Sequence, residues 1–281
     1  MLRIAVPNKG SLAEPASALL TEAGYRQRRD SRELVHADQE NDVEFFYLRP
    51  RDIAVYVGAG TVDVGITGRD LLLDSAAPAV EHLPLGFARS TFRFAAPPER
   101  LSEVGQIQGR RVATSYPVLV ADHLRARGIE AAVVRLDGAV ESAVRLGVAD
   151  VVADVVETGS PRRAAGLAVF GEPILESEAV LVRGSDVPTE GPVDVLTRRI
   201  QGVLVARQYV LMDYDVPTPL VERAVAITPG LESPTVSPLH NSEWSAVRAM
   251  VRREETNRVM DTLYELGARA ILVTSIHACR L

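Results

Sequence analysis

The sequence predicts an α/β protein with two lobes and a C-terminal βαββαβ domain. Through residues 2–155, short apolar strand-like segments alternate with helix-like segments, a pattern typical of βαβ units and mostly parallel sheets. From residue 209 onward the order becomes strand, helix, strand, strand, helix, strand, which is the ferredoxin-like plan. The length of 281 residues, with 47% hydrophobic and 24% charged residues, suits two or three globular domains.

The first lobe begins with a buried strand at residues 2–6 and a turn at 7–10. A helix is predicted to start at Ser11, because Glu14 three residues later completes a capping box. The elements that follow are a strand at 43–48, a helix at 50–57, a strand at 62–68 and a helix at 69–73. We assign residues 1–90 to this lobe, together with a return segment near 180–208.

The second lobe, residues 91–179, repeats the alternation. Strands are predicted at 91–95, 111–114, 129–136 and 150–155, with helices at 118–126 and 139–146 that end at glycines. In open α/β sheets a ligand binds beyond the carboxyl ends of the strands and often between domains. We therefore expect the binding site in the cleft between the two lobes.

The C-terminal domain is assigned to residues 209–281. Its predicted elements are a strand at 210–213, a helix at 220–226, strands at 235–239 and 245–251, a helix at 254–266 and a strand at 269–274. Because a pair of lobes that can hold a catalytic site precedes it, we expect a regulatory or assembly module. The alternative is a purely structural domain.

Charge and cysteine content narrow the function classes. The net charge is -6, so the chain lacks the basic excess with which general nucleic-acid binders neutralise phosphates, although a local cationic pocket is compatible with it. One cysteine, Cys279, cannot form an internal disulfide. The apolar runs are far shorter than the roughly 20 residues of a membrane span, and the N-terminus has no signal-peptide pattern. We expect a cytoplasmic protein that binds neither nucleic acid nor membrane.

Lys9 is the only lysine among 31 Lys and Arg residues. It stands beside a glycine directly after the first strand, where ligands of α/β proteins bind. Lysine is a compact point charge and arginine a planar fork, so a tight phosphate contact can accept one and not the other. We interpret Lys9 as a phosphate contact, and the alternative is chance survival of one lysine.

The stretch from Glu141 to Ser160 is the most informative motif. A helix ending at a glycine leads into a strand, which breaks at Thr158, Gly159 and Ser160 before a new helix. Backbone N–H groups at such a helix start form an anion site, and the two hydroxyls add donors. Asp154 at the strand end is then placed to bind the hydroxyls of a sugar whose phosphate sits in the loop. A Thr-Gly-Ser turn alone, however, is often only a turn.

Residues 141–159 resemble the signature of the ATP phosphoribosyltransferases, the enzymes that begin histidine biosynthesis. The resemblance extends over the whole chain, and its further motifs lie at residues 3–10, 46–52, 63–70, 113–117 and 227–235. Because the last of these motifs is in the C-terminal domain, the chain resembles the long, histidine-regulated form. The resemblance implies a two-lobed, periplasmic-binding-protein-like catalytic unit and an ACT-like C-terminal domain.

The resemblance also implies a reaction and a set of site residues. N1 of ATP is joined to C1 of phosphoribosyl pyrophosphate with release of pyrophosphate, in the presence of Mg²⁺ held mainly by substrate phosphates. Thr158, Gly159 and Ser160 would hold the 5′-phosphate, and Asp154 and Glu141 would bind ribose hydroxyls or their metal. The residues implied to face the nucleotide or the pyrophosphate are Lys9, Arg49, Gly68, Arg69, Asp70 and Tyr116. The charge that develops when pyrophosphate leaves fits cations on one side and carboxylates near the ribose.

This chain departs from the family pattern at Pro161, where a threonine is usual. Proline has neither the hydroxyl nor the backbone N–H, so up to two phosphate donors are missing. Arg162 and Arg163 are interpreted either as replacement charge or as a solvated helix face.

The resemblance finally implies an effector and an assembly. Histidine would bind between ACT-like domains at Asp215, Leu231, Ser233, Thr235 and Ala270, and the protein would be a homo-oligomer, a dimer or a hexamer. If the family resemblance is set aside, the alternative is that these residues only form a turn and part of a strand. The alternative function is a cytoplasmic small-ligand-binding or sensor protein, because the same two-lobed scaffold often only closes on a solute.

Overall fold

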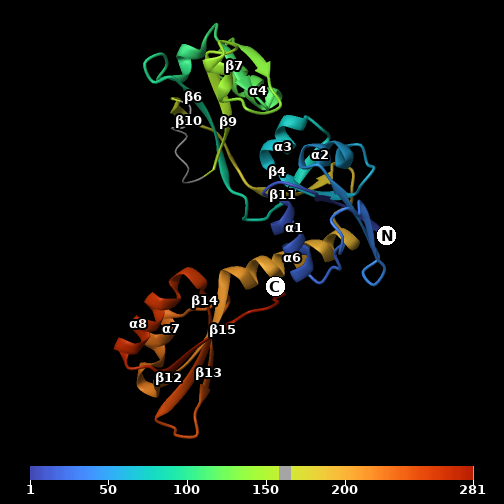
Figure 1. The fold of residues 1–281 in the computed structure, drawn as a ribbon. Helices are drawn as coiled ribbons and strands as arrows, with labels where there is room; N and C mark the ends of the chain where they lie inside the picture. Colours follow the sequence, from blue (N-terminus) through green and yellow to red (C-terminus); the bar gives the residue numbers. More distant parts are fainter. Residues whose placement is uncertain (158–165, 281) are drawn as a thin grey trace. The chain divides into compact units, whose positions relative to one another are not determined.

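The computed structural model describes residues 1–157 and 166–280, and its strands form three sheets (Figure 1). By spatial contacts the chain divides into two units, Met1–Ala18 with Tyr25–Val193 and Leu19–Gly24 with Asp194–Leu281. The first unit holds two α/β sheets and the second a four-stranded sheet, so the predicted fold class is confirmed. The predicted domain limits stay predictions.

The first lobe is built on a six-stranded sheet of order β2-β3-β1-β4-β11-β5. Its strands are β1 (Leu2–Pro7), β2 (Val35–Asp38), β3 (Val43–Leu48), β4 (Val64–Gly68), β5 (Ala79–Pro84) and β11 (Ala179–Gly184). β3, β1 and β4 run parallel in the middle, and every residue of β4 is buried. This burial is expected because βα crossovers cover a parallel sheet with helices on its faces. The helices of this part are α1 (Ala13–Glu22), α2 (Pro50–Gly58) and α3 (Arg69–Ser75).

The second lobe repeats this plan with a five-stranded sheet of order β10-β6-β9-β7-β8. Its elements are β6 (Ser90–Ala96), the 3₁₀ turn η1 (Val104–Ile107), β7 (Arg111–Thr114), α4 (Pro117–Ala126), β8 (Ala132–Arg135), α5 (Ser142–Arg145), β9 (Val151–Glu157) and β10 (Ala168–Ser177). β8, β7 and β9 are parallel, whereas β6 and β10 pair antiparallel. Phe92, Phe94 and Phe170 form the centre of its core.

Two segments connect the lobes, and they are hydrogen-bonded to each other. The chain leaves the first lobe after β5 and returns from β10 to β11 through Glu178 alone. The backbone N–H of Leu85 donates to the carbonyl of Ala179 at 2.9 Å, and the N–H of Ala179 donates to the carbonyl of Phe87 at 2.9 Å. The lobes are therefore joined by a paired double crossover.

The expectation of mostly parallel sheets is wrong in detail. Strands β2, β5, β10 and β11 were not predicted from the sequence, and all of them pair antiparallel with their neighbours. β10 contains Gly171 and Pro173 and shifts register between Phe170 and Leu175, so it lacks a clean alternation. Helix α5 is also shorter than the predicted 139–146, and α1 begins at Ala13 rather than at Ser11.

The second unit contains the predicted ferredoxin-like domain. The strand order is β13-β14-β12-β15, every neighbouring pair is antiparallel, and α7 and α8 cover one face (Figure 1). Along β12 half-buried and buried residues alternate, as a sheet with one covered face requires. The elements are α6 (Pro192–Gln208), β12 (Tyr209–Pro217), η2 (Thr218–Leu220), α7 (Val221–Ile227), β13 (Thr235–Pro238), β14 (Trp244–Arg252), η3 (Arg253–Glu255), α8 (Thr256–Leu266) and β15 (Arg269–Ser275).

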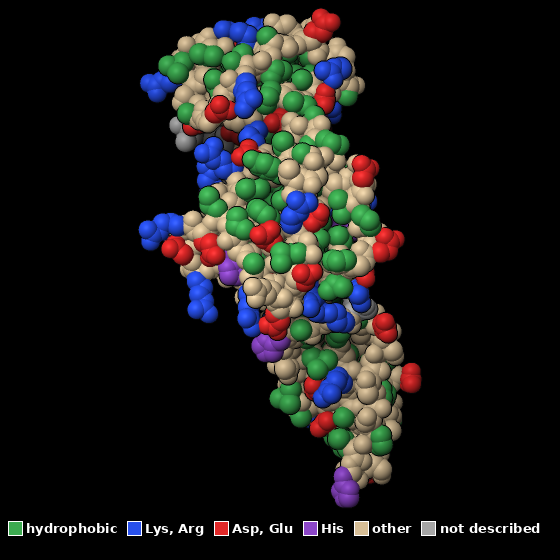
Figure 2. All heavy atoms as spheres, turned by 90° about the vertical axis from the view of Figure 1, so that its right-hand side faces the viewer, with side chains coloured by type: hydrophobic (Ala, Val, Ile, Leu, Met, Phe, Trp, Pro, Cys, Tyr) green, Lys and Arg blue, Asp and Glu red, His purple; other side chains and the backbone are tan. Residues whose placement is uncertain are grey.

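The surface is mixed in charge on the face drawn in Figure 2. Lys and Arg side chains are interspersed there with Asp and Glu, in keeping with 31 basic and 37 acidic residues. Within the described residues, no helix combines the length and the apolar character needed to cross a membrane.

Candidate functional site

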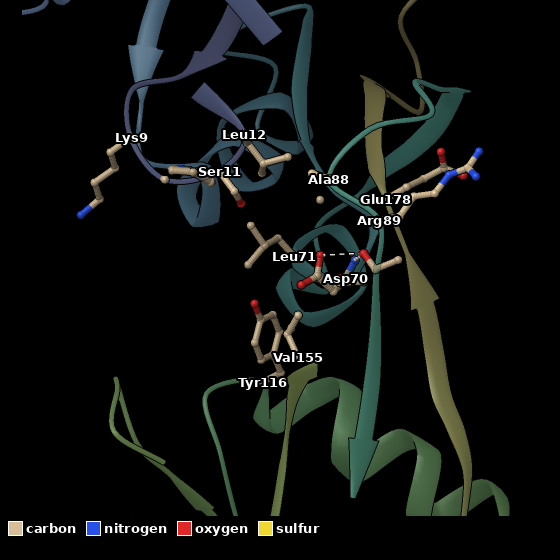
Figure 3. A pocket seen from close by; sticks show the side chains of 15 residues that line it. Lys9, Ser11, Leu12, Asp70, Leu71, Ala88, Arg89, Tyr116, Val155 and Glu178 are labelled. Carbon is tan, nitrogen blue, oxygen red and sulfur yellow. Dashed lines mark hydrogen bonds between the residues drawn. The ribbon is translucent and has the colours of Figure 1, made fainter. Parts of the chain in front are cut away.

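A cleft of about 460 Å³ lies where the two lobes meet the double crossover. The first lobe contributes the β1–α1 loop and the start of α3, and the second lobe contributes Tyr116 and Val155 (Figure 3). The lining residues are Lys9, Gly10, Ser11, Leu12, Pro50, Gly68, Asp70, Leu71, Ala88, Arg89, Ser90, Tyr116, Val155, Ser177 and Glu178. The cleft follows the carboxyl ends of β1 and β4, as expected for an α/β sheet.

Asp70 is the buried carboxylate of the cleft. Asp70 is only 7% exposed, and the hydroxyl of Ser177 donates a hydrogen bond to its Oδ1 at 2.9 Å (Figure 3). The backbone N–H of Asp70 donates back to Ser177 Oγ at 3.1 Å. Ser177 lies at the end of β10, so this pair fastens the start of α3 to the crossover.

Gly68 makes this arrangement of Asp70 possible. A Cβ atom at Gly68 would stand 2.3 Å from Asp70 Oδ1, much closer than any ordinary contact. The backbone of Gly68 is extended, with a φ of -83°, so the requirement is for space and not for an unusual conformation. Gly68 therefore belongs to the site because it lets the carboxylate fold back over the turn.

Tyr116 faces Asp70 from the second lobe, with its hydroxyl directed toward it (Figure 3). Burial raises the pKa of the Tyr116 phenol well above its usual value, and the charge of Asp70 and the hydrogen bond to it raise the pKa further. The negative charge of Asp154 acts in the same direction. Tyr116 thus stays a neutral hydroxyl that donates a hydrogen bond, and it cannot serve as a base near neutral pH.

The basic residues of the cleft lie at its rim. Lys9 lines the opening, is exposed, and extends away from Asp70 and Tyr116 (Figure 3). Arg89, on the crossover, also lines the cleft and was not predicted as a site residue. Ser177 was missed too, because neither residue belongs to a motif or a periodic pattern in the sequence. Four of the predicted site residues, Lys9, Gly68, Asp70 and Tyr116, line this one cleft, and their roles stay predictions.

Arg69 does not line the cleft. Its guanidinium makes a bidentate ion pair with Glu81 at 2.8 Å for both bonds, and a third contact reaches Glu178 at 3.4 Å. These carboxylates raise the pKa of Arg69, with the hydrogen bonds to Glu81 as the largest cause. The positive charge of Arg69 is thus already compensated at the base of the crossover, and its assignment to substrate stays a prediction that the geometry does not favour.

Three other predicted residues lie outside the lining of this cleft. Arg49 is exposed and occupies the N-cap position of α2, where its side chain makes no capping bond, and the next residue, Pro50, lines the cleft. Glu141 is exposed at the start of α5. Asp154 is half-buried on β9, and its Oδ1 accepts the backbone N–H of Val155 at 2.7 Å. The influence of Asp154 on the pKa of Tyr116 places these two side chains near each other.

The predicted phosphate loop directly follows β9 in the sequence. Thr158, Gly159 and Ser160, together with Pro161, Arg162 and Arg163, lie outside the described residues. The strand that leads to them, β9, runs to Glu157 and contributes Val155 to the cleft. The predicted loop therefore follows a strand that reaches the site.

The predicted effector residues lie in the ferredoxin-like domain. Asp215 is half-buried on β12 opposite Ala246 and Arg269, whereas Leu231, Ser233, Thr235 and Ala270 are exposed. The turn that carries three of them is anchored at its base, because Thr228 Oγ1 and the hydroxyl of the buried Tyr214 share a hydrogen bond of 2.7 Å.

No metal cluster exists within residues 1–157 and 166–280: three or more His, Cys, Asp or Glu side chains never converge there on one point. A Mg²⁺ ion commonly takes one or two carboxylates from the protein and its other ligands from phosphates and water. Asp154 on β9 and Glu141 at the start of α5 are single carboxylates of the kind that such an ion takes.

Comparison with known proteins gives consistent matches along the chain. Residues 49–202 match the family model described as ATP phosphoribosyltransferase, and residues 206–278 match the model described as HisG, C-terminal domain. The chain is 69% identical over 284 residues to an ATP phosphoribosyltransferase of Pseudarthrobacter chlorophenolicus and 65% identical over 285 residues to one of Streptomyces coelicolor, with 100% of each chain covered. The solved ATP phosphoribosyl transferase (HisG:HisZ) complex from Thermotoga maritima contains a chain of similar structure, with a TM-score of 0.62, 25% identity and coverage of 72% of this chain and 97% of that chain.

Proposed function

The chain belongs to the ATP phosphoribosyltransferase family, and we propose that the cleft lined by Asp70 and Tyr116 is its active site. Matches to both family models identify the long form, which carries the C-terminal domain. The protein is a pentosyltransferase that joins N1 of ATP to C1 of phosphoribosyl pyrophosphate, releases pyrophosphate, and so begins histidine biosynthesis.

One observation carries the assignment of the cleft. A neutral tyrosine hydroxyl and a buried carboxylate from different lobes meet in it, while basic residues stand at its rim. Adenine N1 carries no proton to remove, so the reaction needs oriented hydrogen bonds and charge stabilisation rather than a strong base. A Tyr116 that keeps its proton suits a contact to the nucleotide.

We assign the remaining roles by charge and position. Lys9 at the exposed edge of the cleft and Arg49, which precedes the lining residue Pro50, would hold phosphates or the departing pyrophosphate. Asp154 would bind ribose hydroxyls from β9. Glu141 is kept as a second ribose or metal carboxylate, and residues 158–160 as the 5′-phosphate loop. Mg²⁺ would enter with the substrate phosphates, with Asp154 or Glu141 as the protein ligand, and would neutralise charge on the departing group.

For the C-terminal domain we propose feedback inhibition by histidine. Asp215 would pair with the effector's ammonium group, and Ser233 with Thr235 would donate to its carboxylate, beside Leu231 and Ala270. The exposed turn supports this assignment because its hydroxyls are accessible to a ligand. A homo-oligomer is proposed as well, and we propose the cytoplasm as the location because the reaction consumes ATP.

The test of the proposed function is pyrophosphate release with ATP, phosphoribosyl pyrophosphate and Mg²⁺. We expect release only when both substrates are present, together with a product that has the mass of the N1 adduct. Ligand binding without release under these conditions would contradict the transferase and support the solute sensor. Chelation of Mg²⁺ should abolish the reaction and leave the fold unchanged.

A further inference from the structure

Asp74 is a buried carboxylate of the first lobe that accepts two hydrogen bonds from the second lobe. It lies on α3 at 8% exposure. Its Oδ1 accepts the backbone N–H of Val118 at 3.0 Å and that of Leu119 at 3.2 Å, both in the first turn of α4. These residues are 44 and 45 positions further along the chain, and α4 packs on the other sheet.

Helix α4 depends on Asp74 for its cap. The first N–H groups of a helix have no partner inside it, and an acceptor at the N-cap residue usually satisfies them. The N-cap residue here is Tyr116, and its side chain makes no capping bond. The carboxylate of Asp74 takes over this role from the opposite lobe, and its negative charge also suits the positive end of the helix dipole.

Arg51 ties the same contact to Tyr116. Its Nη1 donates to Asp74 Oδ2 at 2.9 Å, which orients the carboxylate and leaves Oδ1 for the helix. The guanidinium of Arg51 also lies 4.8 Å from the centre of the Tyr116 ring, a cation–π distance. Tyr116 is thus held by Arg51 at its ring, by Asp70 at its hydroxyl and by the capped helix at its backbone.

We propose that Asp74 is a positioning residue that clasps the two lobes together and sets Tyr116 in the cleft. With the clasp made, α4 is capped and Tyr116 faces Asp70. With the clasp broken, α4 loses its cap, and the double crossover is left as the covalent connection about which the lobes can turn. Only the kinetic effect expected for the clasp rests on the proposed function. The contact between the lobes is made without any substrate.

The first test measures the separation of the lobes in the full chain. Spin labels at Ala59→Cys and Ala126→Cys, two exposed alanines in different lobes, are placed in a Cys279→Ser background. Pulsed EPR should give a broader or displaced distance distribution for Asp74→Ala than for the parent. Asp122→Asn is the matched control, since Asp122 is an exposed carboxylate on α4 paired with Arg125. The same distribution in a folded Asp74→Ala protein as in the parent would overturn the clasp.

The second test is kinetic and asks whether Asp74 acts through Tyr116. We expect Asp74→Ala to lower kcat/KM for ATP at least tenfold. Adding Tyr116→Phe to Asp74→Ala should then lower kcat/KM by less than a further twofold, so that the double variant loses less than the two single changes predict together. Fully additive effects would overturn the positioning role. If Asp74→Ala does not fold, Asp74→Asn replaces it, because the amide keeps an acceptor for α4 but loses the ion pair with Arg51. An inactive parent with a distance change in the variant would refute the proposed function and leave the clasp standing.

Discussion

The cleft and the turn of the C-terminal domain hold their polar groups in opposite ways. In the cleft, Asp70 and Ser177 are 7% and 5% exposed and satisfy each other through two hydrogen bonds. In the turn, Ser233 and Thr235 are exposed, and only the base at Thr228 is buried. Groups that are held before a ligand arrives stabilise a transition state without further ordering, whereas exposed groups must be ordered by the ligand itself.

The turn nevertheless has one constraint of its own. Gly230 has a φ of +74°, a conformation that side chains rarely adopt, and a Cβ there would also stand 3.2 Å from the backbone carbon of Ser233. The path of the turn is therefore set by Gly230 and the Thr228–Tyr214 hydrogen bond, and its tip stays open to solvent. If the comparison is right, substitutions in the cleft act on the reaction, and substitutions in the turn act only on inhibition.

The largest effect is expected for Gly68→Ala. The added methyl group occupies the position of Asp70 Oδ1, so the carboxylate must leave Ser177 and Tyr116. Since the displaced atom is the end of a side chain, the fold should survive. We expect kcat/KM to fall about a hundredfold, roughly 2.7 kcal/mol of transition-state stabilisation.

The control is Gly105→Ala, at an exposed glycine where an added Cβ meets no atom within 4 Å. Both proteins should show cooperative thermal unfolding. Activity of Gly68→Ala within threefold of the Gly105→Ala protein would mean that the position of Asp70 is irrelevant, and the preorganisation of the cleft would lose its main support.

Asp154→Asn tests the strand β9 of the second lobe, where Asp154 lies near Tyr116 but outside the lining of the cleft. The amide keeps the shape of the carboxylate and removes its charge, so we expect a loss of more than tenfold, about 1.4 kcal/mol, in kcat/KM for phosphoribosyl pyrophosphate. The pKa of Tyr116 should fall slightly, because one negative charge that raises it is gone. A variant within twofold of the parent in steady-state kinetics would show that Asp154 has only a structural role.

Asp215→Ala tests the C-terminal side of the comparison. We expect at least tenfold weaker inhibition by histidine, the scale of a lost charge-assisted hydrogen bond, with unchanged activity in the absence of histidine. Asp261→Ala, at an exposed carboxylate of α8, should leave inhibition unchanged. Truncation near residue 210 should abolish inhibition. Calorimetry that detects no histidine binding to the intact protein at millimolar concentration would refute the effector and leave the domain an assembly role.

The elements that could be predicted from the sequence are those with local signals. The apolar runs of β1 and β4 and the proline at the start of α2 mark these elements without any knowledge of the fold. The strand β10 and the helix α6 lack such signals. Gly171 and Pro173 interrupt the strand, and Gly202 lies inside the helix. Gly202 is required there, since an added Cβ would meet the carbonyl oxygen of Cys279 at 2.0 Å.

The site was predictable only where its residues belong to motifs. Lys9, Gly68, Asp70 and Tyr116 follow strands and lie within recognisable segments, and the structure gathers them in one cleft. The partner of Asp70, Ser177, is 107 positions away, so no local pattern connects the two. Arg69 shows that a residue within a motif can still lie outside the site. Its neighbours in the motif face the cleft, whereas its own guanidinium is paired with Glu81.

The smallest effect is expected for Lys9→Arg, and it tests whether burial decides the importance of a cleft residue. Lys9 lines the cleft, yet it is exposed and directed away from Asp70, so it resembles the open turn more than the buried wall. The longer planar guanidinium cannot reproduce a point-charge contact, but an exposed ionic contact contributes only about 0.2 to 1 kcal/mol. We therefore expect activity to fall about threefold with an intact fold, and the loss to shrink as ionic strength rises. Unchanged kinetics at low salt would mean that the single lysine survived by chance. A loss as large as that of Gly68→Ala would show instead that Lys9 turns inward on the substrate, and the division between a buried wall and a weak rim would fail.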